Sequence, residues 1–92
     1  MPSRVMVFEV ISQERNYQEF IIEKDPNRCE QTEIPHSVGD YLTMLATYLR
    51  KAQDAWTNHG GVQGSLHEIR KIGAIAVHCM EDHGAPPRIN EA

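Results

Sequence analysis

Apolar residues recur at intervals of three or four in three separate segments, and this spacing constrains the fold more than any other feature of the sequence. It is the period of an amphipathic helix, whereas side chains of a half-buried strand alternate every second residue. The segments cover about residues 3–23, 37–58 and 65–83, and stretches rich in proline, glycine and charge separate them. The sequence therefore predicts an all-α fold with three helices.

Capping residues indicate where the second and third helices begin and where the third ends. Ser37 is followed three residues later by Asp40, and Ser65 by Glu68, so each serine is predicted to cap its helix in a capping box. Gly84, with two prolines soon after it, is predicted to end the third helix.

The connection over residues 24–36 and the tail over 85–92 differ from the helical segments. The connection contains two prolines and several charges, so we expect a long exposed loop, and we expect a frayed tail. The chain has 92 residues. A chain of this size folds as one domain and buries only about 60% of its unfolded surface. We therefore expect a single domain over 1–92, a three-helix antiparallel bundle that is completed by oligomerisation.

The second helix carries two apolar faces. One is predicted to lie in the core and comprises Val38, Leu42, Leu45, Leu49, Ala52 and Trp56. The core side of the third helix is predicted to comprise Leu66, Ile69, Ile72, Gly73, Ala76 and Met80. The other face of the second helix, with Tyr41, Met44 and Tyr48, is interpreted as an interface. The alternative is that both faces pack inside a three-helix monomer.

Charge and composition argue against several classes of function. Nine basic and thirteen acidic residues give a formal net charge of −4, and the basic ones are dispersed, which disfavours duplex nucleic acid as a partner. No segment has the pattern of a membrane span or a signal peptide, so we expect no membrane partner and a cytoplasmic location. Cys29 and Cys79 are too few for a disulfide framework and are interpreted as reduced thiols.

Two polar residues, Glu14 and Gln18, occupy positions where the apolar stripe of the first helix would continue. A polar side chain at such a position needs a hydrogen-bond partner or a functional role. Two interpretations follow. Glu14 pairs with a neighbouring arginine or a helix end, or both residues line a ligand site.

Polar residues with helical spacing also occur on the other two helices. Thr47 and Lys51 share one face of the second helix, and Glu68 and Lys71 share one face of the third. If these faces border one cavity, the lysines would hold a phosphate and the other polar side chains a base or sugar. The alternative is that both lysines are solvated and that Glu68 only caps its helix.

Histidines gather near the predicted end of the third helix, where His78, Asp82 and His83 lie close together. A metal ion would need further protein donors that the sequence does not identify, and a helix C-terminus favours histidine without any ligand. No metal site is therefore predicted. His36 and His59 lie beside loops and are expected to be exposed.

Several short motifs resemble one known family. They are Glu14-Arg15-x-x-Gln18 in the first helix, Trp56 at the end of the second, and Leu66-x-Glu68, Ile72-Gly73-Ala74-Ile75-Ala76-Val77 and Glu81 in the third. Over roughly Val7 to Gly84 they resemble the short, phage-type branch of the MazG-like all-α nucleoside triphosphate pyrophosphohydrolases. The resemblance implies dimers or tetramers that hold magnesium with two acidic pairs and hydrolyse nucleotides to monophosphate and pyrophosphate.

The acidic pairs of that family are only partly present. The first pair falls on Thr47 or Tyr48 and on Lys51, and the second falls on Glu68 and Lys71. Because magnesium prefers carboxylate oxygens, one glutamate and two ammonium groups make a poor magnesium site. The two lysines supply positive charge instead, which favours binding an anionic nucleotide without activating water.

We therefore expect a catalytically degenerate MazG-like homo-oligomer, phage-encoded by resemblance, that binds or sequesters a nucleotide-type ligand and needs no cofactor. A phage would benefit from such a binder if it removed a nucleotide signal used in host defence, a purpose that the sequence does not select. No catalytic residue is predicted. The residues expected to bind the ligand are Glu14, Arg15, Gln18, Thr47, Lys51, Glu68 and Lys71.

Two alternative functions remain. The first is a magnesium-dependent pyrophosphohydrolase that draws its carboxylates from Glu14, Asp40, Asp54, Glu68 and Glu81. The second is a protein-interaction module that grips a host protein through Tyr41, Met44 and Tyr48.

Overall fold

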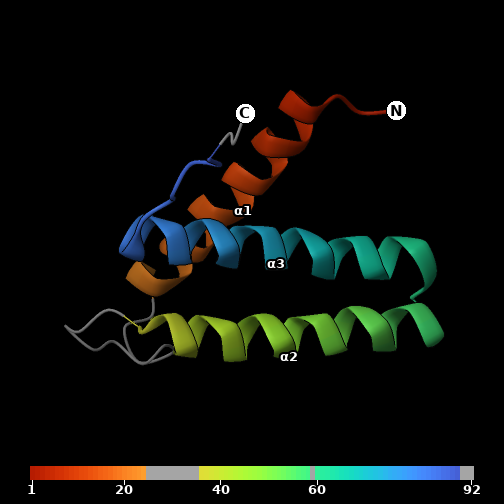
Figure 1. The fold of residues 1–92 in the computed structure, drawn as a ribbon. Coiled ribbons are helices and arrows are strands. Elements are labelled where there is room, and N and C mark those ends of the chain that lie inside the picture. Colours follow the sequence, from red (N-terminus) through yellow and green to blue (C-terminus); the bar gives the residue numbers. More distant parts are fainter. Residues whose placement is uncertain (25–35, 59, 90–92) are drawn as a thin grey trace.

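The computed structural model describes residues 1–24, 36–58 and 60–89. These residues form three helices and no strand, so the predicted all-α fold is confirmed (Figure 1). The helices are α1 (Arg4–Lys24), α2 (Val38–Thr57) and α3 (Gly61–His83). Within the described ranges, none of the helices has both the length and the apolar character needed to cross a membrane.

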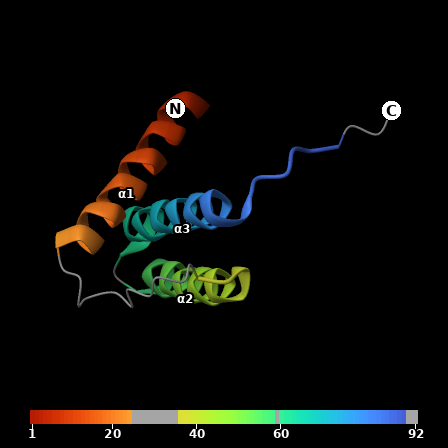
Figure 2. The same cartoon turned by 90° about the vertical axis from the view of Figure 1, so that its left-hand side faces the viewer.

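The helix α3 is the middle element of the bundle. It runs antiparallel to α2 along one side, and α1 crosses its other side obliquely (Figures 1 and 2). In the described part of the chain, α1 makes no close approach to α2. Most of the predicted loop over 24–36 lies outside the described residues, as do Cys29 and His59.

The start of α2 is the one that the sequence predicts. Ser37 is the N-cap, and its Oγ accepts a hydrogen bond from the Asp40 backbone N–H at 3.0 Å. The Asp40 carboxylate accepts one in return from the Ser37 backbone N–H, also at 3.0 Å. Two backbone donors that the helix leaves unpaired are thereby satisfied.

The start of α3 differs from the prediction. The helix begins at Gly61, four residues before the predicted cap, and Ser65 is buried inside it. Gly61 has a φ of 57°, a left-handed conformation that glycine adopts without strain, and this lets the chain reverse and enter the helix at once. The Ser65 hydroxyl instead donates to the Ala52 carbonyl of α2 at 3.2 Å. The helix ends at His83, as predicted.

The face of α2 that packs on α3 is shifted from the predicted one, since Ala52 of the predicted stripe is buried and Leu45 is half-buried. The predicted core residues Leu42, Leu49 and Trp56 are more than half exposed, whereas Tyr41 is 1% exposed. Tyr41 lies against α3 because its hydroxyl donates to the Asp82 carboxylate there. The prediction of Tyr41 as an interface residue is therefore wrong, because its side chain is used inside the chain.

The predicted core side of α3 is also only partly correct. Ile69 and Met80 are about half exposed, while Ala74 and Ile75 are buried. A neighbouring helix approaches closely at Gly73, which the sequence places on the core side, because a Cβ atom there would lie 3.1 Å from Ile11 Cδ1 of α1. The absence of a side chain at Gly73 therefore lets α1 sit directly on α3.

Candidate functional site

The first of the predicted site residues, Glu14, is paired inside the protein. Its side chain is 10% exposed, and its Oε1 accepts a hydrogen bond from Arg70 Nε of α3 at 2.6 Å. This is the structural interpretation that the sequence allowed, in which Glu14 pairs with an arginine. The pair helps to hold α1 on α3.

Arg15, the neighbour of Glu14, makes a second link between the same helices. Its side chain is 9% exposed, and Nε donates to Glu81 Oε1 of α3 at 2.7 Å. Another nitrogen, Nη2, pairs with Glu19 one turn later in α1 at 3.0 Å. The remaining nitrogen, Nη1, is buried without a hydrogen-bond partner among the described residues. Gln18 lies half-buried on the same helix.

The predicted lysines lie on the α2–α3 pair. Lys51 is exposed, and its Nζ lies 4.6 Å from the centre of the Tyr48 ring, a cation–π arrangement. Lys71 Nζ lies 3.3 Å from Glu68 Oε1, and the other carboxylate oxygen of Glu68 is buried without a hydrogen-bond partner in the described part of the chain. Thr47 is exposed and donates to the carbonyl oxygen one turn earlier.

These residues form two groups and not one cavity lining. Because α1 does not approach α2, the α1 residues Glu14 and Arg15 are separated from the α2 residue Lys51. The second group comes together from α2 and α3. Tyr48 lies one turn before Ala52 and Glu68 about one turn after Ser65, so the contact of Ser65 with Ala52 places Tyr48 and Glu68 at the same level of the antiparallel pair.

The residues of the second group do not fit the magnesium that the family resemblance implies. The ligand positions hold Lys51 and Lys71, and the single carboxylate, Glu68, is already beside an ammonium group. Among the described residues, no three histidine, cysteine, aspartate or glutamate side chains are grouped so that they could hold a metal ion. Glu14 and Glu81, which the enzyme alternative requires, are paired with arginines.

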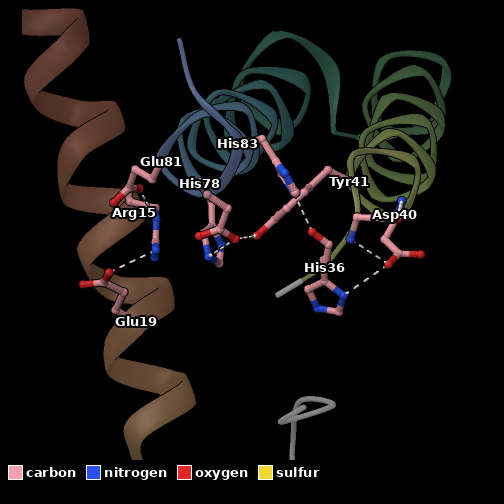
Figure 3. Close-up of polar contacts among 10 residues, drawn as sticks. Arg15, Glu19, His36, Asp40, Tyr41, His78, Glu81 and His83 are labelled. Carbon is pink, nitrogen blue, oxygen red and sulfur yellow. Dashed lines mark hydrogen bonds and ion pairs between the residues drawn. The ribbon is translucent and has the colours of Figure 1, made fainter. Parts of the chain in front are cut away.

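A cluster that was not predicted from the sequence surrounds the Tyr41 ring (Figure 3). The rings of His36, His78 and His83 meet it edge-on, with centres 5.7, 5.2 and 6.0 Å away. The cluster joins the start of α2 to the end of α3. A signal was present, since an antiparallel α2–α3 pair brings Tyr41 next to His78 and Asp82, but it depends on knowing which face of α2 packs.

The polar groups of this cluster are paired among themselves. His83 Nε2 lies 2.6 Å from the His36 carbonyl oxygen, and His78 Nε2 lies 3.6 Å from Asp82. His36 is half-buried and not exposed as predicted, because its ring packs against Tyr41. Burial and the hydrogen bond to Asp82 raise the pKa of Tyr41 well above its ordinary value. The phenol therefore stays protonated and donates to the carboxylate.

His78 gives the cluster a dependence on pH. Burial and the nearby Arg15 charge lower the pKa of His78 below 6.5, although Asp82 opposes this shift. The unfolded chain thus binds the proton more readily than the folded one. The contribution of His78 to the free energy of unfolding is therefore complete above about pH 6.5 and decreases as the pH falls through its lowered pKa.

We expect His78→Gln to flatten this part of the curve of unfolding free energy against pH, measured by urea denaturation. His67→Gln, on the same helix but exposed, is the control, and an unchanged slope in His78→Gln would contradict the assignment.

Comparisons of the chain with protein-family models, with curated proteins and with solved structures give no significant match.

Proposed function

We propose that this chain is a catalytically degenerate MazG-like protein that forms a homo-oligomer and binds a nucleotide-type ligand without hydrolysing it. The proposal depends on one observation. Where the resembling family carries acidic pairs, the α2–α3 pair presents Lys51, exposed and stacked over Tyr48, and Lys71 at the level of Tyr48 and Glu68.

The chemistry of this group suits an anionic ligand with a flat ring. Lys51 has no carboxylate partner among the described residues, so its ammonium group is available to a phosphate. The Tyr48 ring offers an apolar and aromatic surface beside it, and a carboxylate such as Glu68 accepts hydrogen bonds from the N–H groups of a base. Charge, stacking and hydrogen bonding are thus supplied within one small region.

The same residues argue against hydrolysis. A pyrophosphohydrolase of the resembling family needs magnesium to polarise the phosphate and activate water, and that ion needs several carboxylate oxygens. A lysine neutralises phosphate charge but does not lower the pKa of a bound water as a metal ion does. We therefore propose a protein that retains its ligand, in the cytoplasm and, for a phage, as a means of removing a nucleotide signal used in host defence.

Oligomerisation is proposed from the exposed apolar residues. Only four hydrophobic residues are buried among those described, and large ones such as Phe8, Leu49 and Trp56 are more than half exposed. Apolar surface of this extent on a small soluble chain is typical of a protein that associates. The alternative of a host-protein contact through Tyr41, Met44 and Tyr48 is weakened, because Tyr41 is buried and cannot contact a partner.

A mass-spectrometry experiment tests the ligand part of the proposal. The purified chain is incubated with a pool of nucleoside triphosphates and cyclic nucleotides plus magnesium, and free and denaturation-released nucleotides are then analysed. We expect the pool to stay intact and one nucleotide to be enriched in the released material, with the same result when magnesium is chelated. Formation of monophosphate and pyrophosphate would support the enzyme instead, and an absence of retained nucleotide would contradict binding.

A further inference from the structure

One side of the α2–α3 pair is apolar and uncharged. Six large side chains on it are between 45% and 62% exposed, and we call them the hairpin face: Leu42, Leu49, Trp56, Val62, Ile69 and Met80. Those in α2 are seven residues apart, and those in α3 are seven and eleven apart. Both spacings return to nearly the same side of a helix.

The two halves of the hairpin face lie on the same side of the pair. Leu42 directly follows Tyr41, and Met80 directly follows Cys79, which lies one turn before His83, whose ring contacts the Tyr41 ring. One residue turns a helix by about 100°. Because α2 and α3 are antiparallel and face each other, this rotation places Leu42 and Met80 on the same side of the helix pair. The apolar surface is therefore continuous with the α2–α3 contact and extends it outward.

The area of this face approaches what one partner contributes to a stable interface. Six large apolar side chains that are each about half exposed leave several hundred Å² open to water, approaching the about 800 Å² that each partner contributes to a standard interface. A monomer that leaves this much contiguous apolar surface in water is unusual.

We propose that the hairpin face binds the hairpin face of a second copy of this chain, in a two-fold symmetric four-helix arrangement. In a two-fold symmetric contact the residues near the axis lie close to their own copies, so a charged residue there would be repelled by the same charge. On this face, the positions between the six residues are held by uncharged side chains, for example Leu45, Ile72 and Ala76. The seven-residue spacing along α2 is that of helices packed at a shallow angle in such bundles.

The symmetric contact leaves the lysine group open. Lys51 directly precedes Ala52, which faces α3, so it turns to the side opposite the hairpin face. Self-association through the hairpin face is thus independent of ligand binding. The interface rests on the oligomeric part of the proposed function, which a monomeric wild type would contradict, whereas wild-type mass in Leu49→Glu would contradict the hairpin face alone. Either result leaves the ligand site standing.

Replacing Leu49 with glutamate tests this interface. The variant places a carboxylate at the middle of α2, where two-fold symmetry brings two copies of it into one apolar contact. We expect light scattering after size exclusion to give the wild type an even multiple of the 10.5 kDa chain mass, and Leu49→Glu half of the wild-type mass or less. The dissociation constant is expected to rise about a hundredfold or more, since an unpaired charge is buried.

Thr43→Glu is the matched control, because it adds the same charge to an exposed position of α2 outside the hairpin face and is expected to keep the wild-type mass. A second readout needs no variant. Trp56 is the one tryptophan in the sequence, and its emission is expected to shift to the red on dilution of the wild type. A monomeric wild type, wild-type mass in Leu49→Glu, or concentration-independent Trp56 emission would overturn the proposal.

Discussion

Replacing Lys51 and Lys71 together with glutamate is expected to weaken binding of the retained nucleotide about a hundredfold or more. Each change turns an attraction for phosphate into a repulsion of similar size, and Lys71→Glu also sets a second carboxylate beside Glu68. Affinity is measured by isothermal titration calorimetry with the nucleotide recovered from the wild type. The neutral pair Lys51→Gln and Lys71→Gln is expected to give an intermediate loss.

The control for the two lysine substitutions is Arg50, which directly precedes Lys51 in the sequence. Arg50 is exposed on α2, on the side turned away from α3, so Arg50→Glu makes the same charge reversal on a neighbouring residue. We expect Arg50→Glu to bind nearly as the wild type does. Equal affinity of the wild type and of a folded double lysine variant, with helicity checked by circular dichroism, would remove the lysine site.

Tyr41→Ala is expected to lower the free energy of unfolding by about 3–5 kcal/mol, the range for truncating a large buried aromatic residue. Tyr41 is the largest fully buried side chain among those described, and it contacts residues from the start of α2 and the end of α3. Tyr41→Phe keeps the ring and removes only the hydrogen bond to Asp82, for an expected loss of about 1 kcal/mol. Urea unfolding at one fixed protein concentration measures both.

The comparison residue is Tyr17 of α1, whose side chain is 56% exposed. Because it contributes little buried area, Tyr17→Ala is expected to change stability by no more than about 0.5 kcal/mol. If Tyr41→Ala were as mild as Tyr17→Ala, the Tyr41 cluster would not be the anchor between α2 and α3.

Local signals in the sequence were sufficient for the helices but not for their faces. The capping box at Ser37 and the glycine stop after His83 depend on neighbouring residues only, and both are present as predicted. Ser65 has the same local pattern as Ser37, yet it is buried inside α3. The difference comes from Gly61, whose positive φ starts the helix earlier, and a cap motif alone does not reveal this.

The choice of face on α2 depended on a distant partner. Leucines are more apolar than tyrosines, so the stripe with Leu42 and Leu49 was the natural prediction for the core. Tyr41 is buried instead because Asp82, far along the chain, accepts a hydrogen bond from its hydroxyl. The same holds for the candidate site. Pairing of Glu14 with an arginine was foreseeable, but its partner Arg70 was not.

The position of α3 between the other helices gives the protein two levels of cooperativity. Among the described helices, α1 packs on α3 alone, and its links to α3 include two ion pairs and the contact of Ile11 with Gly73. Detachment of α1 is therefore expected to leave the α2–α3 hairpin and its Tyr41 cluster intact. Amide protons of α1 are then expected to exchange with solvent through a local opening, and faster than those of the α2–α3 hairpin, which exchange only when the hairpin itself unfolds. The first helix is thus a layer that can open separately from the α2–α3 hairpin on which it packs.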